Sequence, residues 1–227
     1  MLKPKVIYED NHLLIVEKPS GWLVQGDNTG DSTLTDWGTS YIRKKYNKPG
    51  NVFCQPCHRL DRPVSGLVIF ARTSKALERM NKLFRDDEIS KTYLAIVNER
   101  PPKEQGTLTH WLEKDEKRNV TRAYQKQKGK SKKAELSYSL LSSMGKHSLL
   151  KVSPKTGRPH QIRVQLKSIN CPIKGDLKYG FPKPNQDKSI DLHAFKLDFI
   201  HPVKKEPIRV FSKPKWTDYK DFVHELD

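Results

Sequence analysis

The sequence predicts a mixed α/β fold, of the α+β kind, built on a largely antiparallel sheet. Short apolar runs that are typical of strands are interspersed with amphipathic stretches that are typical of helices, without the regular alternation of βαβ units. Several strands follow one another through short turns, as antiparallel neighbours do. The length suits one domain, so we expect residues 1–227 to form a single domain.

The first predicted elements are a strand pair and a helix. Residues 6–8 and the continuous apolar run 13–16 are separated by polar residues that favour a turn, and the second run is expected to be buried on both faces. A helix is predicted to begin near Ser32. Its core-facing side would carry Leu34, Trp37 and Tyr41.

The middle of the chain predicts a strand, a helix and a further strand. The apolar run 67–70 is the first strand, Ser74 is expected to cap the helix, and residues 93–97 form the second strand. The helix would bury one stripe made of Leu77, Met80, Leu83 and Phe84.

The last third predicts three strands and a helix. Strands are expected at 134–141 and 148–152, followed by a helix near Pro159, a residue suited to the first helical position. This helix would bury Ile162, Leu166 and Ile169. Residues 193–199 alternate with period two, as in a half-buried strand that ends before Pro202.

Residues 114–133 interrupt these patterns. They contain nine lysines and arginines and almost no aliphatic residues, and Gly129 lies among the lysines. We expect a basic, mobile loop here. The sequence leaves two roles equally open: an arm that grips phosphates, or a solvated extension of a hairpin.

The charge of the whole chain favours a nucleic-acid partner. Its 43 lysines and arginines against 26 acidic residues give a net charge of +17 and a pI near 9.7. Such a chain binds phosphate backbones through counterion release, although membranes and acidic proteins also attract it. No basic leader precedes an apolar segment, and no apolar run approaches the roughly 18 residues of a membrane span. We therefore expect a cytoplasmic protein that does not enter a membrane.

The three cysteines indicate a reducing compartment and not a disulfide framework. Cys54 and Cys57 lie in a C-x-x-C-H pattern, which occurs in haem attachment and in redox or zinc sites. Haem attachment would require export, and zinc would require a second ligand pair, whereas Cys171 stands alone. We interpret all three as buried thiols and predict no metal.

The polar stretch from His58 to Gly66 is the candidate catalytic loop. It immediately precedes a predicted buried strand, a common place for functional residues. Asp61 lies between Arg59 and Arg62, whose charges favour an ionised carboxylate that can act as a nucleophile. Spacing alone favours a structural salt-bridge loop.

A family resemblance changes that balance. The run HRLDRPVSGLVIFARTSKA from His58 resembles the central motif of the pseudouridine synthases related to the RluA group. Other segments resemble that family in the same order, from residue 6 to residue 202: YEDNHLLIVEKPSG, KTYLAIV, GRPHQIRVQL with PIKGDLKYG, and LHAFKLDFIHP. The family's S4-type N-terminal domain has no counterpart in this sequence, so RNA affinity is expected from the basic domain itself.

The resemblance implies the fold of the pseudouridine synthase catalytic domain and the isomerisation of uridine to pseudouridine in ribosomal or transfer RNA. It implies that Asp61 attacks the ribose or the uracil ring, or removes a ribose proton. No metal, nucleotide or other cofactor is implied. A monomer is expected.

The resemblance also implies substrate-binding residues. Tyr93 would stack on the target base and assist proton removal at C5, and Arg163 would pair with the catalytic carboxylate. Arg59 would enter the RNA stack as the uridine flips out, because a stacked base hides its glycosidic bond. Hydrogen bonds from His58, His160 and Gln161 would shape the pocket.

Two departures and two rival functions complete the prediction. Pro63-Val64 and Pro159 differ from the residues common in the family, which puts the preferred substrate in doubt more than the activity. A catalytically silent RNA-binding protein on the same fold predicts loss of the Asp, Tyr and Arg trio, and all three residues are present. A haem or redox protein built on the C-x-x-C-H pattern leaves the family motifs unexplained.

Overall fold

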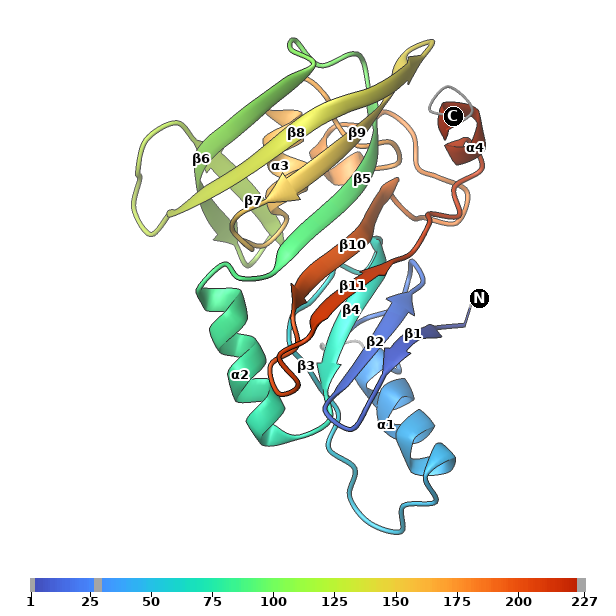
Figure 1. The fold of residues 1–227 in the computed structure, drawn as a ribbon. Helices are drawn as coiled ribbons and strands as arrows, with labels where there is room; N and C mark the ends of the chain where they lie inside the picture. The colour runs from blue at the N-terminus through green and yellow to red at the C-terminus, as the bar shows by residue number, and fades with distance from the viewer. Residues whose placement is uncertain (1–2, 27–29, 224–227) are drawn as a thin grey trace. The chain divides into compact units, whose positions relative to one another are not determined.

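The computed structural model describes residues 3–26 and 30–223, which divide into two compact units (Figure 1). Unit 1 contains residues up to 90 together with 194–213, and unit 2 contains residues 91–193 and those from 214 onwards. The chain therefore builds most of unit 1, forms unit 2, returns to unit 1 and ends in unit 2. The mixed fold with a largely antiparallel sheet is confirmed, while the single-domain organisation stays a prediction.

The strands of unit 1 surround its core. They are β1 (Lys5–Glu9), β2 (Leu13–Lys18), β3 (Gln55–Pro56), β4 (Ser65–Ala71), β10 (Leu192–Ile200) and β11 (Pro207–Phe211). β2 pairs antiparallel with both β1 and β4, β3 pairs with β4, and β11 pairs with β10. The predicted burial of residues 13–16 is confirmed, since all four side chains have no exposed surface.

Two helices with side-chain caps belong to unit 1. Helix α1 (Leu34–Lys45) begins after Thr33, which forms a capping box with Asp36. Its buried line consists of Leu34, Gly38 and Ile42, so the predicted face was partly wrong. Trp37 and Tyr41 are half-buried and stack on each other, with ring centroids 5.5 Å apart.

Helix α2 (Ser74–Arg85) is capped one residue earlier than predicted. Thr73 has extended backbone angles, and its hydroxyl accepts a hydrogen bond from the Ala76 amide at 3.1 Å. Met80 of the predicted stripe is fully buried, as is Ala76, whereas Leu77, Leu83 and Phe84 are half-buried.

Unit 2 is an antiparallel sheet with a helix on one face. Its strands, in spatial order, are β5 (Ser90–Asn98), β9 (His147–Pro154), β8 (Lys132–Met144), β6 (Gln105–Asp115) and β7 (Val120–Tyr124). Helix α3 (Gln161–Lys167), the 3-10 turn η1 (Leu177–Tyr179) and helix α4 (Tyr219–Val223) complete it. Val164 of α3 and Tyr179 pack on Leu112 and Ala134 of the sheet.

Residues 114–133 contain strand β7 between two turns, and are not irregular throughout. β7 pairs with β6, so this segment extends the sheet edge as a hairpin. The hairpin form was one of the two alternatives in the sequence, and mobility of the segment stays a prediction.

Helix α3 begins later than predicted. Its first residue is Gln161, and not Pro159, and the preceding His160 adopts left-handed backbone angles of φ 52° and ψ 21°. Helical geometry cannot continue through such a residue. The helix ends at Lys167, so Ile169 lies beyond it and is half-buried. No helix among the described residues has the length and apolar character needed to cross a membrane.

Gly66, at the start of β4, has no room for a side chain. Its φ is +117°, and an added Cβ would lie 2.4 Å from the carbonyl oxygen of Ala194 in β10. We expect Gly66→Ala to lower the free energy of unfolding by about 2–4 kcal/mol, because strain at positive φ adds to overpacking. Denaturant unfolding would measure this. Gly50→Ala is the matched control, since Gly50 has open space and no positive φ, and an equal loss there would refute the explanation.

Candidate active site

The candidate catalytic loop is anchored on both sides of Asp61. Leu60 and Val64 are buried in unit 1, with 9% and 2% of their surface exposed. The Val64 amide donates a hydrogen bond to the Asp61 carbonyl at 3.0 Å, which closes a turn around the aspartate. Asp61 itself is half-buried and Arg59 is exposed. The two buried side chains and the backbone turn therefore fix the position of the Asp61 backbone.

Residues 19–22 form a second loop, which is hydrogen-bonded to this turn. The Gly21 amide donates to the Arg62 carbonyl at 2.9 Å, and the Ser20 hydroxyl donates to the Pro63 carbonyl at 3.0 Å. The Arg62 guanidinium donates to the Gly21 carbonyl and pairs with Asp31 at 2.8 Å. Arg62 therefore joins the two loops through these contacts. One of the two arginines that flank Asp61 thus has a structural role.

Lys18 is a buried cation behind the Asp61 loop. Its side chain has no exposed surface, and its Nζ donates to the carbonyls of Pro19, Trp22 and Arg62 at 3.1, 2.8 and 3.2 Å. Burial lowers the pKa of Lys18 to about 7, although the negative charge of Asp61 raises it. Three carbonyl acceptors match the three N–H groups of an ammonium, so the site can hold the charged form at pH values below this pKa.

This lysine predicts a pH-dependent stability. If the folded chain releases the Lys18 proton near pH 7 and the unfolded chain holds it to the ordinary lysine pKa, the unfolded state binds more protons between these values. Stability then rises with pH from about 7 to 10, at roughly 1.4 kcal/mol per pH unit. We expect the difference in unfolding free energy between wild type and Lys18→Met to grow accordingly in urea titrations. A flat difference would show that the carbonyls keep the ammonium charged throughout.

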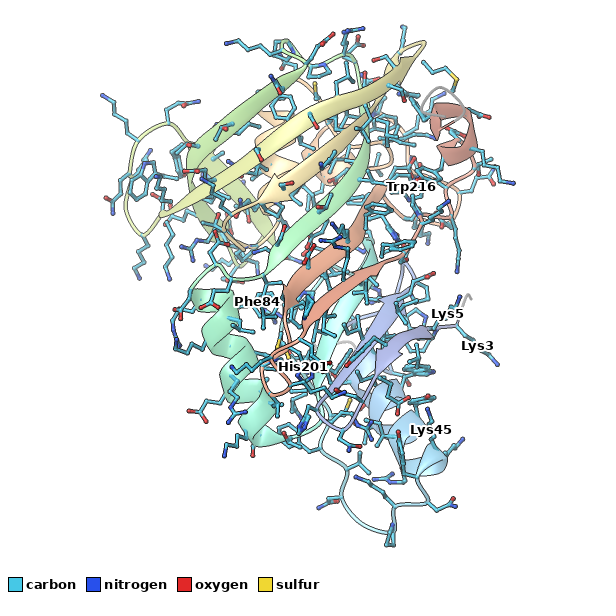
Figure 2. All side chains as sticks on the ribbon, viewed as in Figure 1. Lys3, Lys5, Lys45, Phe84, His201 and Trp216 are labelled. Atoms are coloured by element: carbon cyan, nitrogen blue, oxygen red, sulfur yellow. The ribbon has the colours of Figure 1, made fainter. Side chains whose placement is uncertain are left out.

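His58 contacts neighbouring residues of unit 1, and the three cysteine thiols are largely shielded from solvent. The Nε2 atom of His58 accepts a hydrogen bond from the Ile69 amide at 3.1 Å, and its ring lies 5.0 Å from that of Phe84, labelled in Figure 2. Burial raises the pKa of Cys54 and Cys57 to about 12 and that of Cys171 to about 11. All three are therefore protonated thiols at neutral pH.

Tyr93 lies on the face of the unit 2 sheet that carries α3. In the strand register it is opposite Val152, which is opposite Tyr138 on the next strand. Tyr138 shares its face with Ala134, which packs against Val164 of α3. Tyr93 is half-buried.

Arg163 forms a buried, bidentate ion pair with Asp176. Its Nε and one Nη donate to the two carboxylate oxygens at 2.7 and 2.8 Å, and the side chains are only 5% and 1% exposed. Sequence reasoning did not find this partner. The pair uses two of the five guanidinium N–H donors.

Tyr179 and His160 extend this buried cluster. The Arg163 guanidinium lies over the Tyr179 ring, 5.0 Å from its centroid. The Tyr179 hydroxyl lies 2.8 Å from Nδ1 of His160 and accepts a hydrogen bond from the Thr121 amide at 2.8 Å. Thr121 belongs to β7, so the basic hairpin and the Arg163 cluster are directly connected.

Gln161 connects α3 to the neighbouring loop. The side-chain oxygen of Gln161 accepts hydrogen bonds from the Thr156 hydroxyl and the Arg158 backbone amide. The side-chain NH2 group of Gln161 donates to the Glu135 backbone carbonyl. The contacts fix the start of the helix that carries Arg163.

The four predicted site residues are distributed over both units. Asp61 and Arg59 share one loop of unit 1, and Tyr93 and Arg163 lie on the same side of the unit 2 sheet. Sequence reasoning missed Lys18, Asp176 and Tyr179, although all three lie in segments that carry the family resemblance. Among the described residues, no group of three or more His, Cys, Asp or Glu side chains is arranged to hold a metal ion.

Comparisons with known proteins identify the class. Over 97% of its length the fold matches 92% of human RNA pseudouridylate synthase domain containing 4, with a TM-score of 0.77 at 23% identity. Residues 12–168 match the RNA pseudouridylate synthase family. The chain belongs to this family.

Individual bacterial relatives differ in their named RNA. Ribosomal large subunit pseudouridine synthase D of Borreliella burgdorferi is 34% identical over 85% of this chain, which spans 60% of that relative. Dual-specificity RNA pseudouridine synthase RluA of Haemophilus influenzae is 31% identical over 92% of both chains. tRNA pseudouridine synthase C of Vibrio cholerae is 30% identical over 90% of this chain and 88% of its own length. The relatives are named as pseudouridine synthases, which are RNA isomerases.

Proposed function

We propose that this protein isomerises specific uridines in ribosomal or transfer RNA to pseudouridine, with Asp61 as the nucleophile. The observation that carries the proposal is the anchored Asp61 turn, held by a buried lysine and a second loop within a chain of this family. A backbone fixed in this way limits the positions that the Asp61 carboxylate can take during the reaction.

The reaction rearranges bonds within one nucleotide. The bond from N1 of uracil to C1′ of ribose breaks, the base rotates, and C5 forms a new bond to C1′. The proton at C5 is lost and N1 gains one, so there is neither redox change nor hydrolysis. Asp61 attacks the ribose or the uracil ring, or removes a ribose proton.

The other predicted residues assist. Tyr93 stacks on the flipped uracil, and its hydroxyl assists removal of the C5 proton. In this proposal Arg163 pairs with the catalytic carboxylate, and Asp176 and Tyr179 hold its guanidinium. Arg59, exposed on the Asp61 loop, fills the gap that the flipped base leaves in the RNA stack.

The proposed partner follows from charge, since a net charge of +17 supports binding of RNA by this domain. The proposal also places the protein in the cytoplasm, as a monomer. Relatives named for ribosomal RNA, for transfer RNA and for dual-specificity RNA modification support this substrate class.

A test compares cellular RNA from strains with the intact protein, without it, and with Asp61→Ala. Every pseudouridine is located by carbodiimide-stop sequencing. We expect one or more sites to vanish in both altered strains, which would establish the enzyme and its substrate together. If Asp61→Ala keeps the modification, the nucleophile is assigned wrongly. If no site changes in either strain, a catalytically silent RNA-binding protein becomes the better description.

A further inference from the structure

A basic, exposed surface extends from the edge of unit 2. We define the hairpin surface as residues 116–133, which comprise β7, the turns on both sides of it and the first two residues of β8. Nearly all of its charged residues are exposed. In Figure 2 nitrogen-tipped side chains spread outward from the turn between β7 and β8.

Most cations of the hairpin surface have no acidic neighbour. Within the described chain, no carboxylate lies within ion-pair distance of six of them: Lys117, Arg118, Lys126, Lys128, Lys130 and Lys132. Arg122 is 3.7 Å from Asp115, a long and exposed pair. Unneutralised cations at one edge favour a polyanion, because binding it releases counterions.

Two aromatic residues adjoin these cations. Trp111 of β6 and Tyr124 of β7 lie directly opposite each other, and both are half-buried. The Lys128 ammonium lies over the Tyr124 ring, 5.3 Å from its centroid. Aromatic rings between lysines are typical of surfaces that bind unpaired RNA, where bases stack and phosphates meet cations.

The same strand reaches the candidate active site within unit 2. The Thr121 amide donates to the Tyr179 hydroxyl, and its own hydroxyl donates to the Pro159 carbonyl at 2.9 Å. The Tyr179 ring in turn lies against the Arg163 guanidinium. The hairpin surface is therefore connected, within unit 2, to the residues that hold Arg163.

We propose that the hairpin surface binds the RNA backbone that flanks the target uridine, with Tyr124 stacking on an unpaired base. This rests on the proposed function for the identity of the polyanion. It assigns the basic segment a substrate-holding role that lies apart from the chemical step.

The test uses the full chain and a fluorescein-labelled RNA stem–loop with a uridine-rich loop, followed by fluorescence anisotropy over a range of salt. One variant carries Lys126→Gln, Lys128→Gln and Lys130→Gln. The matched control carries Lys103→Gln, Lys146→Gln and Lys220→Gln, three exposed lysines of unit 2 outside the hairpin surface. A third variant carries Tyr124→Ala.

We expect the hairpin variant to raise Kd by about tenfold or more near physiological salt, since each lost phosphate contact costs about fourfold. Its slope of log Kd against log salt should flatten by about 2, at about 0.7 per contact with single-stranded RNA. Tyr124→Ala should raise Kd with an unchanged salt slope. An equal loss in the control variant, unchanged binding in the hairpin variant, or no binding by the wild type would overturn the proposal.

Pseudouridine formation, measured separately, distinguishes this inference from the proposed function. If the hairpin variant loses affinity but the wild type isomerises no uridine, the surface assignment stands and the catalytic one fails. If the wild type isomerises uridine and the hairpin variant binds RNA as tightly, only the surface assignment fails.

Discussion

Asp61→Asn is expected to lower the rate of pseudouridine formation by on the order of 10⁴-fold or more, with little change in RNA affinity. The amide has nearly the shape of the carboxylate but lacks its negative charge and nucleophilicity. Single-turnover kinetics with saturating enzyme would measure the chemical step, and anisotropy would measure binding. The turn around residue 61 is made by backbone atoms and by Leu60 and Val64, so the fold should persist.

The control for this prediction is Asp86→Asn. Asp86 is also a carboxylate of unit 1, but it pairs with Lys82 at the exposed end of α2. Its loss should leave the rate within a few-fold of wild type. Retention of activity by Asp61→Asn, with intact circular dichroism, would exclude Asp61 as the nucleophile and leave its loop with the salt-bridge role that spacing alone favours.

Strands with a strong apolar pattern were predictable, and strands stabilised by their neighbours were not. β2 and β4 are continuous apolar runs, and both are buried as predicted. β6 and β7 are polar on much of their surface, and they form because each pairs with an adjacent strand. The start of α3 was misplaced because the left-handed conformation of His160 leaves no mark in an apolar pattern.

In the candidate site too, contacts between neighbours in sequence were predictable, whereas contacts between distant residues were not. Asp61 and its arginines are adjacent in sequence, so their local chemistry was visible. Lys18 acts on the Arg62 carbonyl 44 residues away, and Asp176 binds Arg163 across 13 residues. Such pairings depend on how loops are folded back, which spacing does not encode. The burial of Lys18 in KPSG and of Asp176 in GDLKYG could therefore not be predicted from the sequence.

Asp176→Asn should destabilise the chain by about 3–5 kcal/mol, the usual result of leaving a buried charge without its partner. Asp176 and Arg163 are almost fully buried, and the asparagine amide would direct its own donors at the guanidinium. For a chain of this size the loss corresponds to a fall in Tm of roughly 6–20 °C, measurable by thermal unfolding. Asp198→Asn is the matched control, because Asp198 accepts from the Nε of Arg209 at 2.9 Å but in an exposed pair.

A double variant separates stability from function at this pair. Replacing both ions together, as Arg163→Met with Asp176→Leu, removes the unpaired charge, and such replacements are often neutral or stabilising. We expect it to recover most of the stability lost in Asp176→Asn while uridine isomerisation is abolished, because the proposed mechanism pairs Arg163 with the carboxylate of Asp61. A double variant that regains both stability and activity would show that the buried pair only supports the fold, and Arg163 would then lose its place in the proposed mechanism.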